Sequence, residues 1–158
     1  MSDYRLRGYR KSDLDALVRL DDICFAPQFR FTRATMRRFA EDVRARVVIA
    51  EQREELVGFC IAHIEPENAG YVVTLDVDPT HWRNGIASLL MQRAEEECRV
   101  AGCVSMALHV FTGNTAAIRF YERSGYVNAG TVENFYGTGV HALVYFKPLG
   151  IGAVSSYS

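Results

Sequence analysis

The feature that most constrains the fold is a strand that changes directly into a helix around Gly85. Residues 71–77 form an apolar run typical of a buried strand, and Asp78 and Pro79 end it. From Gly85 onward the apolar side chains recur at helical spacing. Such a turn leaves backbone N–H groups unpaired at the positive end of the helix dipole. The segment therefore predicts a sheet with a helix packed on it and an anion site between them, with a diphosphate as the natural guest.

The remaining pattern predicts a mixed sheet in a single α/β (mixed α+β) domain. A helix between the strands at 71–77 and 104–110 implies a parallel crossover, whereas the short connections elsewhere imply antiparallel hairpins. We expect a domain over residues 1–148 and a flexible C-terminal tail over 149–158, because the residues of the tail are small and rich in Gly and Ser. The other strands are expected at 4–9, 45–51, 56–64, 126–133 and 140–146, and the helices at 12–20, 32–43, 86–101 and 114–124.

Composition excludes several classes of protein. Hydrophobic residues make up 49% of the chain and charged residues 23%, which is the balance of a globular domain and not of a disordered one. The formal charge of −1 gives no broad attraction to nucleic acid or to anionic membranes. No apolar run approaches a membrane span and no secretory leader is evident, so we expect a cytoplasmic protein without nucleic-acid or membrane partners.

The cysteines do not indicate a metal or redox site. The chain has four of them and no C-x-x-C pair, and each stands alone in apolar surroundings: Cys24, Cys60, Cys98 and Cys103. We expect reduced thiols that pack as small apolar side chains.

A second motif lies on the helix predicted after residue 113. Asn114, Ala117 and Tyr121 are about one and two turns apart, so they share one face of that helix. The structural interpretation is a capping Asn, a packed Ala and a half-buried Tyr, with Gly125 just past the helix end.

Together the two motifs resemble those of the GCN5-related N-acetyltransferase (GNAT) family. The family loop Q/R-x-x-G-x-G/A corresponds to residues 82–87, and residues 114–126 match N-x-x-A-x-x-x-Y-x-x-x-G-Y. Within the family, residues 71–75, 108–110 and 133–136 are most similar to protein N-terminal acetyltransferases of the ribosomal-protein-alanine type. The resemblance implies a mostly antiparallel twisted sheet of about seven strands with about four helices, and a central parallel pair splayed at the cofactor.

The resemblance also implies an enzyme that transfers an acetyl group from acetyl-CoA to a primary amine by direct attack, with no metal. The main chains of Leu75 and Val77 would then bond the pantetheine arm. The helix-start loop would cradle the diphosphate, and the second motif would contact the cofactor from the other side. The implied cofactor-binding residues are Leu75, Val77, Arg83, Asn84, Gly85, Ile86, Ala87, Ser88, Asn114, Ala117 and Tyr121.

Three side chains are the expected catalytic group. His109 has an ordinary pKa near 6.5, suited to take a proton from the amine directly or through a water held by Tyr71. Tyr121, with a pKa of about 10, would stay protonated and serve the leaving sulfur. One departure from the family loop is Trp82, where a Gln or Arg is usual; an indole offers a stacking face in place of a charge.

The acceptor is the least determined part of the function. An α-amine, with a pKa of about 7.7–8.0, loses its proton more readily than a lysine, so we expect a protein or peptide N-terminus. Phe25, Pro27 and Tyr136 match the loops that flank the peptide groove in the resembling enzymes. The alternatives are a polyamine, amino acid or antibiotic amine, which Glu65 and Glu67 would favour, and a non-catalytic acyl-CoA-binding module. A monomer and a homodimer both fit the sequence.

Overall fold

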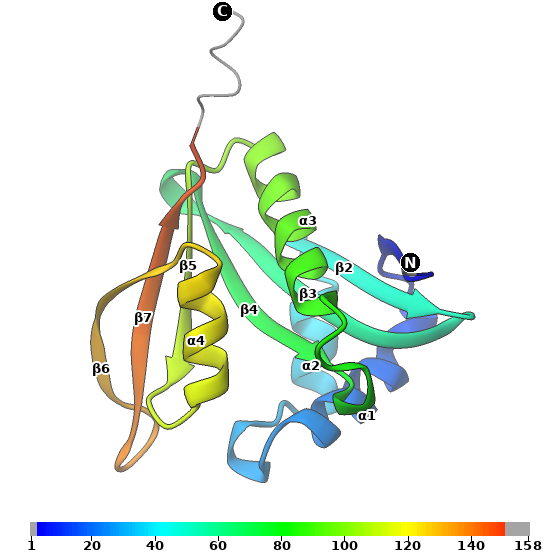
Figure 1. The fold of residues 1–158 in the computed structure, drawn as a ribbon, viewed down its shortest axis with the longest axis horizontal. Helices are drawn as coiled ribbons and strands as arrows, with labels where there is room; N and C mark the ends of the chain where they lie inside the picture. The colour runs from blue at the N-terminus through cyan, green and yellow to red at the C-terminus, as the bar shows by residue number, and fades with distance from the viewer. Residues whose placement is uncertain (1–2, 151–158) are drawn as a thin grey trace, which may run out of the picture.

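The computed structural model describes residues 3–150. The described residues form seven strands and four helices, with four short 3₁₀ turns between them (Figure 1). In chain order the elements are β1 (Arg5–Gly8), η1 (Lys11–Asp13), α1 (Leu14–Cys24), η2 (Pro27–Phe29), α2 (Arg33–Ala40), β2 (Ala45–Gln52), β3 (Glu55–Glu65), η3 (Pro66–Asn68), β4 (Ala69–Val77), η4 (Pro79–His81), α3 (Ile86–Val100), β5 (Ser105–Phe111), α4 (Thr115–Arg123), β6 (Val127–Gly137) and β7 (Val140–Pro148).

The strands of the described residues form one sheet of seven, in the order β1-β2-β3-β4-β5-β7-β6. Every neighbouring pair is antiparallel except β4 and β5, which are parallel and connected by α3. This pair is hydrogen-bonded only over Ala69–Tyr71 and Ser105–Ala107, and the two strands separate beyond it (Figure 1). The predicted fold class, with its splayed central pair, is confirmed.

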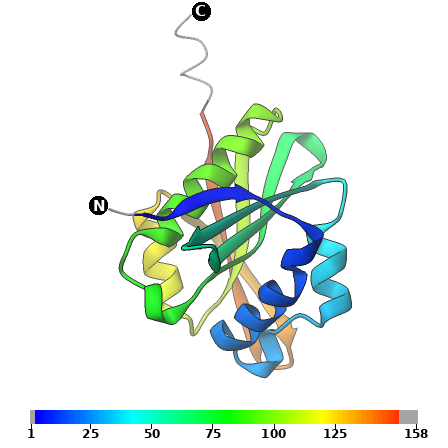
Figure 2. The same ribbon diagram turned by 90° about the vertical axis from the view of Figure 1, so that its right-hand side faces the viewer.

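Helices cover both faces of the sheet, as Figure 2 shows. On one face, α1 and α2 bury Leu17 and Met36 against β2 and β3. On the other face, α3 buries Leu90 and Cys98, and α4 buries Tyr121. Because β3 contributes side chains to both cores, its sequence is a continuous apolar run and not an alternation of apolar and polar residues.

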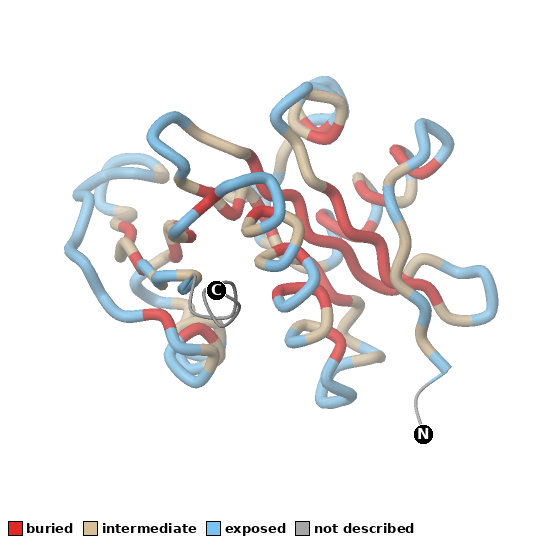
Figure 3. The backbone as a smooth tube through the Cα atoms, turned by 90° about the horizontal axis from the view of Figure 1, so that it is seen from above, coloured by how far each residue is buried: buried red, intermediate tan, exposed pale blue. Residues whose placement is uncertain are grey.

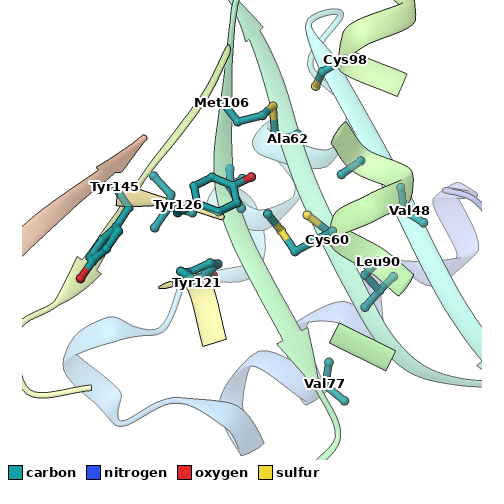
Figure 4. Close-up of a cluster of buried hydrophobic side chains, with 14 of the residues drawn as sticks. Val48, Cys60, Ala62, Val77, Leu90, Cys98, Met106, Tyr121, Tyr126 and Tyr145 are labelled. Carbon is teal, nitrogen blue, oxygen red and sulfur yellow. The ribbon is translucent and has the colours of Figure 1, made fainter. Parts of the chain in front are cut away.

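The two ends of the sheet differ in how they are covered. Buried segments run through the central strands, whereas the β6 edge is exposed (Figure 3). In the core on the α3 face, Cys60 and Leu90 lie between α3 and the sheet. Tyr126, directly before β6, reaches toward them (Figure 4). The Tyr126 hydroxyl donates to Glu95 on α3 at 2.7 Å, which ties β6 to that helix.

The ends of α1 and α2 differ from the ends predicted from the sequence pattern. The helix expected over 12–20 continues one turn further, to Cys24, and the helix expected to reach residue 43 ends at Ala40. Asp13, at the N-cap position of α1, makes no capping hydrogen bond; its side chain accepts from the Arg10 backbone N–H and pairs with Arg7 at 2.9 Å. The extra turn of α1 brings the end of this helix against β4.

The expected domain boundary at residue 148 stays a prediction. β7 ends at Pro148, the predicted boundary, and the Leu149 backbone N–H still donates to the Val104 carbonyl at 2.9 Å. Residues 151–158 of the expected tail lie outside the described residues. Within residues 3–150, no helix combines the length and apolar character that a membrane crossing requires.

The short parallel pairing predicts that Gly70→Ala lowers stability. A Cβ at Gly70 would collide with the Met106 sulfur and lie 3.3 Å from the Cys98 sulfur, and both neighbours are fully buried. Overpacking of this kind costs about 1–3 kcal/mol in the free energy of unfolding. Urea denaturation measures the change. Gly8→Ala is the control, because a Cβ there meets nothing within 4 Å; equal stabilities of the two variants would contradict the prediction.

Candidate functional site

A cleft opens where β4 and β5 separate. Its volume is about 410 Å³, and it is bounded by both strands, by the segment between α1 and α2, and by α4. The lining residues are Cys24, Phe25, Ala26, Phe29, Phe31, Val72, Val73, Thr74, Leu75, Leu108, His109, Val110, Phe111, Gly113, Asn114, Ala117, Tyr121 and Tyr136.

The main chain of β4 faces this cleft at alternate residues. The Asp78 N–H donates to Val57 on β3 at 2.8 Å, and the register pairs Asp76 with Phe59. Main-chain groups alternate in direction along a strand, so those of Leu75 and Val77 point away from β3 toward the separated β5. The cleft thus presents strand-edge donors and acceptors in the middle of a sheet, which suits an extended ligand that carries amides.

Trp82 occupies part of this edge. Its indole Nε1 donates to the Val77 carbonyl at 2.8 Å, and the Cys24 thiol donates to the same oxygen at 3.2 Å. The carbonyl of Val77 is therefore engaged within the chain, and its N–H is the group that remains directed at the cleft. The departure from the usual Gln or Arg has a structural role here, while 58% of the Trp82 surface stays exposed.

The start of α3 has the backbone geometry that suits an anion. Arg83 (φ 70°) and Gly85 (φ 78°) both have left-handed backbone conformations, a geometry that turns successive N–H groups into one concavity. The first-turn N–H groups of the 15-residue α3 point into the same region. Ile86 is buried in the core, whereas Asn84 donates to the Tyr4 hydroxyl at 3.1 Å, which braces the loop.

The face predicted on α4 adjoins the cleft. Asn114 caps the helix, with its side-chain oxygen accepting the Ala117 N–H at 3.1 Å, as expected. Tyr121 is 8% exposed, and its hydroxyl makes no hydrogen bond within residues 3–150. Burial raises the pKa of Tyr121 far above its ordinary value, so the phenol stays protonated. A protonated, unpartnered hydroxyl therefore lines the cleft.

His109 and Tyr71 form a hydrogen-bonded pair on the two separated strands. The Tyr71 oxygen lies 2.8 Å from His109 Nδ1. The His109 ring also stacks on Phe135 of β6, with centroids 4.1 Å apart and planes 8° from parallel. Burial lowers the pKa of His109 and raises that of Tyr71 to about 12. At neutral pH the imidazole is therefore neutral and able to accept a proton.

Aromatic rings close one side of the cleft. Phe29 on η2 lies 5.0 Å from the Tyr136 ring on β6 and 5.1 Å from the Phe111 ring on β5. Of the three expected acceptor residues, Phe25 and Tyr136 line the cleft. Pro27 does not: it is exposed, and it begins the 3₁₀ turn that carries Phe29.

Several cleft residues escaped the sequence interpretation. They are Cys24, Phe29, Phe31, Phe111 and, behind His109, Phe135. An aromatic residue in a loop or strand usually packs in a core, so these residues carried no local signal. Only the register of β5, β6 and β7 brings Phe135 and Phe111 to the site.

Other polar residues lie elsewhere. Glu65, considered for an acidic acceptor site, pairs with Arg44 at 3.3 Å, and neither Glu65 nor Glu67 lines the cleft. The histidines expected to be structural have their own partners: His63 bonds the Phe39 carbonyl, His81 bonds Tyr4, and His141 accepts the Asn134 N–H. All four cysteines are free thiols, and in the described part of the chain no three metal-ligating side chains form a group.

Two curated relatives differ in how much of their length the chain matches. The chain is 24% identical over 162 residues to an N-alpha-acetyltransferase of Sulfurisphaera tokodaii, covering 93% of this chain and 94% of that protein. It is 30% identical over 89 residues to mycothiol acetyltransferase of Saccharopolyspora erythraea, covering 56% of this chain but only 29% of that protein.

Solved structures share the fold along nearly the whole chain. The ribosomal-protein-S18-alanine N-acetyltransferase of Escherichia coli superposes with a TM-score of 0.84 at 22% identity, covering 93% of this chain and 94% of that one. A chain of the NatC complex bound to Gag peptide and CoA gives a TM-score of 0.81 at 18% identity, covering 94% of this chain and 100% of that one. The expected likeness to N-terminal acetyltransferases is confirmed among these relatives.

The family assignment comes from a model of the whole family. The model described as the Acetyltransferase (GNAT) family matches residues 14–126, from the first residue of α1 to the tyrosine that follows α4. The match includes β4, the loop before α3, β5 and α4, which contain the cleft strands and both sequence motifs. The chain belongs to the GNAT family of acetyltransferases.

Proposed function

We propose that the protein transfers an acetyl group from acetyl-CoA to the N-terminal amine of a protein or peptide. The observation that carries the proposal is the separation of β4 and β5, which leaves a cleft between an exposed strand edge and two polar aromatic side chains, His109 and Tyr121. The relatives and neighbours described above support the same activity. Cytoplasmic location and the oligomeric state stay predictions.

The donor side of the site fits coenzyme A. The left-handed Arg83 and Gly85 with the start of α3 suit a diphosphate, and the main chain of Leu75 and Val77 suits an arm that carries amides. When bound, acetyl-CoA supplies the reactive thioester. The chain's own contribution is to hold that group beside the acceptor and to exclude water.

His109 is suited to take the proton from the acceptor amine. When its Nδ1–H donates to the Tyr71 oxygen, the lone pair of Nε2 is free to accept a proton. Phe135 keeps the ring in place from one side. Tyr71 is thus a positioning residue that sets the tautomer of the base.

Tyr121 is suited to serve the leaving sulfur. Its hydroxyl lines the cleft, has no partner in residues 3–150, and stays protonated because burial raises its pKa. Donation of that proton, or of a strong hydrogen bond, would stabilise the developing thiolate.

The cleft favours an acceptor whose neighbouring groups are apolar. None of the described residues that line it carries a carboxylate, and its acceptor side is built from Phe25, Phe29, Phe111 and Tyr136. A polyamine would leave its extra charges without partners there. Mycothiol acetyltransferase among the relatives supports a second candidate, a small-molecule amine. Release of free thiol with peptides of varied first residue, compared with small amines, decides between them; CoA binding without release on any acceptor would indicate a binding module.

Gly85→Ala should weaken coenzyme A binding, because the added methyl group would occupy the space where the diphosphate approaches the main chain. Trp82 is the only tryptophan of the chain, so its fluorescence reports the titration. The matched control is Gly102→Ala, at the other end of α3, which has a left-handed φ of 104° and equally open space. Both variants should lose about 1–2 kcal/mol of stability, but only Gly85→Ala should bind at least about tenfold more weakly. Equal affinities would contradict the diphosphate site.

Tyr121→Phe should lower kcat by about 10²-fold while the affinity for coenzyme A changes little, because only proton donation to the leaving group is lost. Steady-state kinetics with the best acceptor measures the change. Tyr145→Phe is the control, since Tyr145 is equally buried and its hydroxyl bonds Glu122, away from the cleft. Wild-type turnover by Tyr121→Phe would remove Tyr121 from the mechanism.

His109 should set the acid limb of the pH–rate profile. Its pKa is lowered by burial, so kcat should fall as the pH drops through a value below the ordinary 6.5. His109→Gln should abolish that limb and reduce the plateau rate by about 10²-fold. Tyr71→Phe should lower the rate but keep a limb, because the imidazole remains. An unchanged acid limb in His109→Gln would assign the limb to another group.

A further inference from the structure

Two aspartates without a cationic partner meet beneath the cleft. Asp21 lies in the last turn of α1 and Asp76 lies in β4, between Leu75 and Val77. Their exposed fractions are 0% and 1%, and their carboxyl groups lie within hydrogen-bond reach of each other. No arginine, lysine or histidine of residues 3–150 forms an ion pair with either of them.

Of the four carboxylate oxygens, one of each aspartate has a donor and the other has none. Asp21 Oδ2 accepts the Phe31 backbone N–H at 2.9 Å, and Asp76 Oδ1 accepts the Thr74 hydroxyl at 2.5 Å. Asp21 Oδ1 and Asp76 Oδ2 are shielded from solvent and have no donor within the described residues. Two ionised carboxylates in such a place would repel each other and carry an uncompensated desolvation cost. A single proton between the two oxygens removes both penalties.

The surroundings do not supply another source of compensation. Burial raises the pKa of both aspartates, and that of Asp76 lies well above its ordinary value. The charged or titratable groups that face the pair from the neighbouring elements are Asp22 and Cys24 on α1, Arg30 after η2, Cys60 on β3 and Tyr121 on α4. Arg30 is the only cation among these: it donates to the Phe25 carbonyl, lies 3.9 Å from Asp22 and forms no ion pair with Asp21 or Asp76.

The pair connects two parts of the candidate site. On one side, Asp21 holds the Phe31 backbone, which ends the acceptor loop, defined here as residues 25–31. On the other side, Asp76 is in the strand whose main chain faces the cleft. Cys24 adds a parallel link from α1 to the Val77 carbonyl. The acceptor loop is therefore attached to β4 at its base, while Phe29 touches Tyr136 at its tip.

We propose that Asp21 and Asp76 share one proton and that this hydrogen bond fastens the acceptor loop to β4, which makes the two aspartates positioning residues for the acceptor amine. The part that concerns the acceptor rests on the proposed function. The shared proton and the fastening of the loop do not, and they are testable without any activity.

The shared proton has a defined effect on stability. In the unfolded chain both aspartates lose their protons near pH 4, whereas the folded protein keeps one. Unfolding then releases that proton, so the unfolding equilibrium constant rises by up to about tenfold per pH unit from about pH 5 until the pair itself ionises. Other groups add their own slopes, so the comparison of variants isolates this one.

The first experiment is urea denaturation between about pH 5 and pH 7. Asp76→Asn replaces the shared proton by an amide hydrogen that does not titrate. The unfolding equilibrium constant rises by a certain factor per pH unit in each protein. In Asp76→Asn this factor should be at least about three times smaller than in the wild type. Asp22→Asn, an exposed neighbour on the same helix, should keep the wild-type slope. Equal slopes in the wild type and Asp76→Asn would overturn the shared proton.

The second experiment tests the loop. Asp21→Leu removes both the link to Asp76 and the acceptor for the Phe31 N–H, whereas Asp21→Asn keeps both through its amide. Trypsin should cut after the exposed Arg30 at least about fivefold faster in Asp21→Leu than in the wild type, and Asp21→Asn should restore most of the protection. Equal cleavage rates in all three proteins would overturn the fastening role. If Asp21→Leu does not fold, the cleavage rates of Asp21→Asn and the wild type are compared as the pH rises. Cleavage of the wild type should accelerate at a lower pH than cleavage of Asp21→Asn. Identical pH profiles of the two proteins would overturn the proposal.

Kinetics then separates this inference from the proposed function. In Asp21→Leu, the KM for the acceptor should rise at least about tenfold while the KM for acetyl-CoA stays within about twofold. Asp21→Asn should recover most of the acceptor KM. Equal increases in both KM values would show general loosening and overturn the positioning role. A wild-type protein that is inactive on every acceptor, but shows the expected pH slope and protection, would refute the proposed function and leave the shared proton intact.

Discussion

The site depends on hydrogen bonds that β4 and β5 do not make with each other. After three residue pairs the two strands separate, although each stays fully paired to its outer neighbour, β3 or β7. Unpaired main-chain groups inside a sheet are costly unless water or a ligand satisfies them. The cleft is therefore both a break in the sheet and a binding edge. α3 and α4 follow these two strands, and they bring the Gly85 turn and Tyr121 toward it.

The polar side chains at the opening come from both strands: His109 and Tyr121 lie on β5 and on α4, which follows it, and Tyr71 lies on β4. Tyr121 comes from α4, after β5, and burial keeps its phenol protonated. His109 comes from β5 itself, is neutral because burial lowers its pKa, and bonds Tyr71 across the strand pair. One low-dielectric environment thus keeps both side chains neutral, since desolvation disfavours the charged form of each.

Departures from the family pattern are compensated locally. Trp82 replaces a Gln or Arg and uses its indole N–H to bond the Val77 carbonyl, so the loop before α3 is tied to β4 by a neutral group. Cys24 reaches the same carbonyl from α1. With the Asp21–Asp76 contact, these bonds make the end of β4 a junction between residues 25–31 and the loop before α3.

The sequence by itself determined the elements and the short-range parts of the site. Apolar periodicity and glycine positions predicted the strands, α3 and α4, and the Gly85 turn and the Asn114 cap are local features whose atoms lie within a few residues of each other. The tertiary structure decided the contacts between distant segments. The stack of His109 on Phe135 depends on the register of β5, β7 and β6. The Asp21–Asp76 contact depends on one more turn of α1 than local pattern indicated, and an aspartate in an amphipathic helix is ordinarily solvated. Burial, and with it the pKa of each group, is a property of the neighbours that folding supplies and that no window of sequence contains.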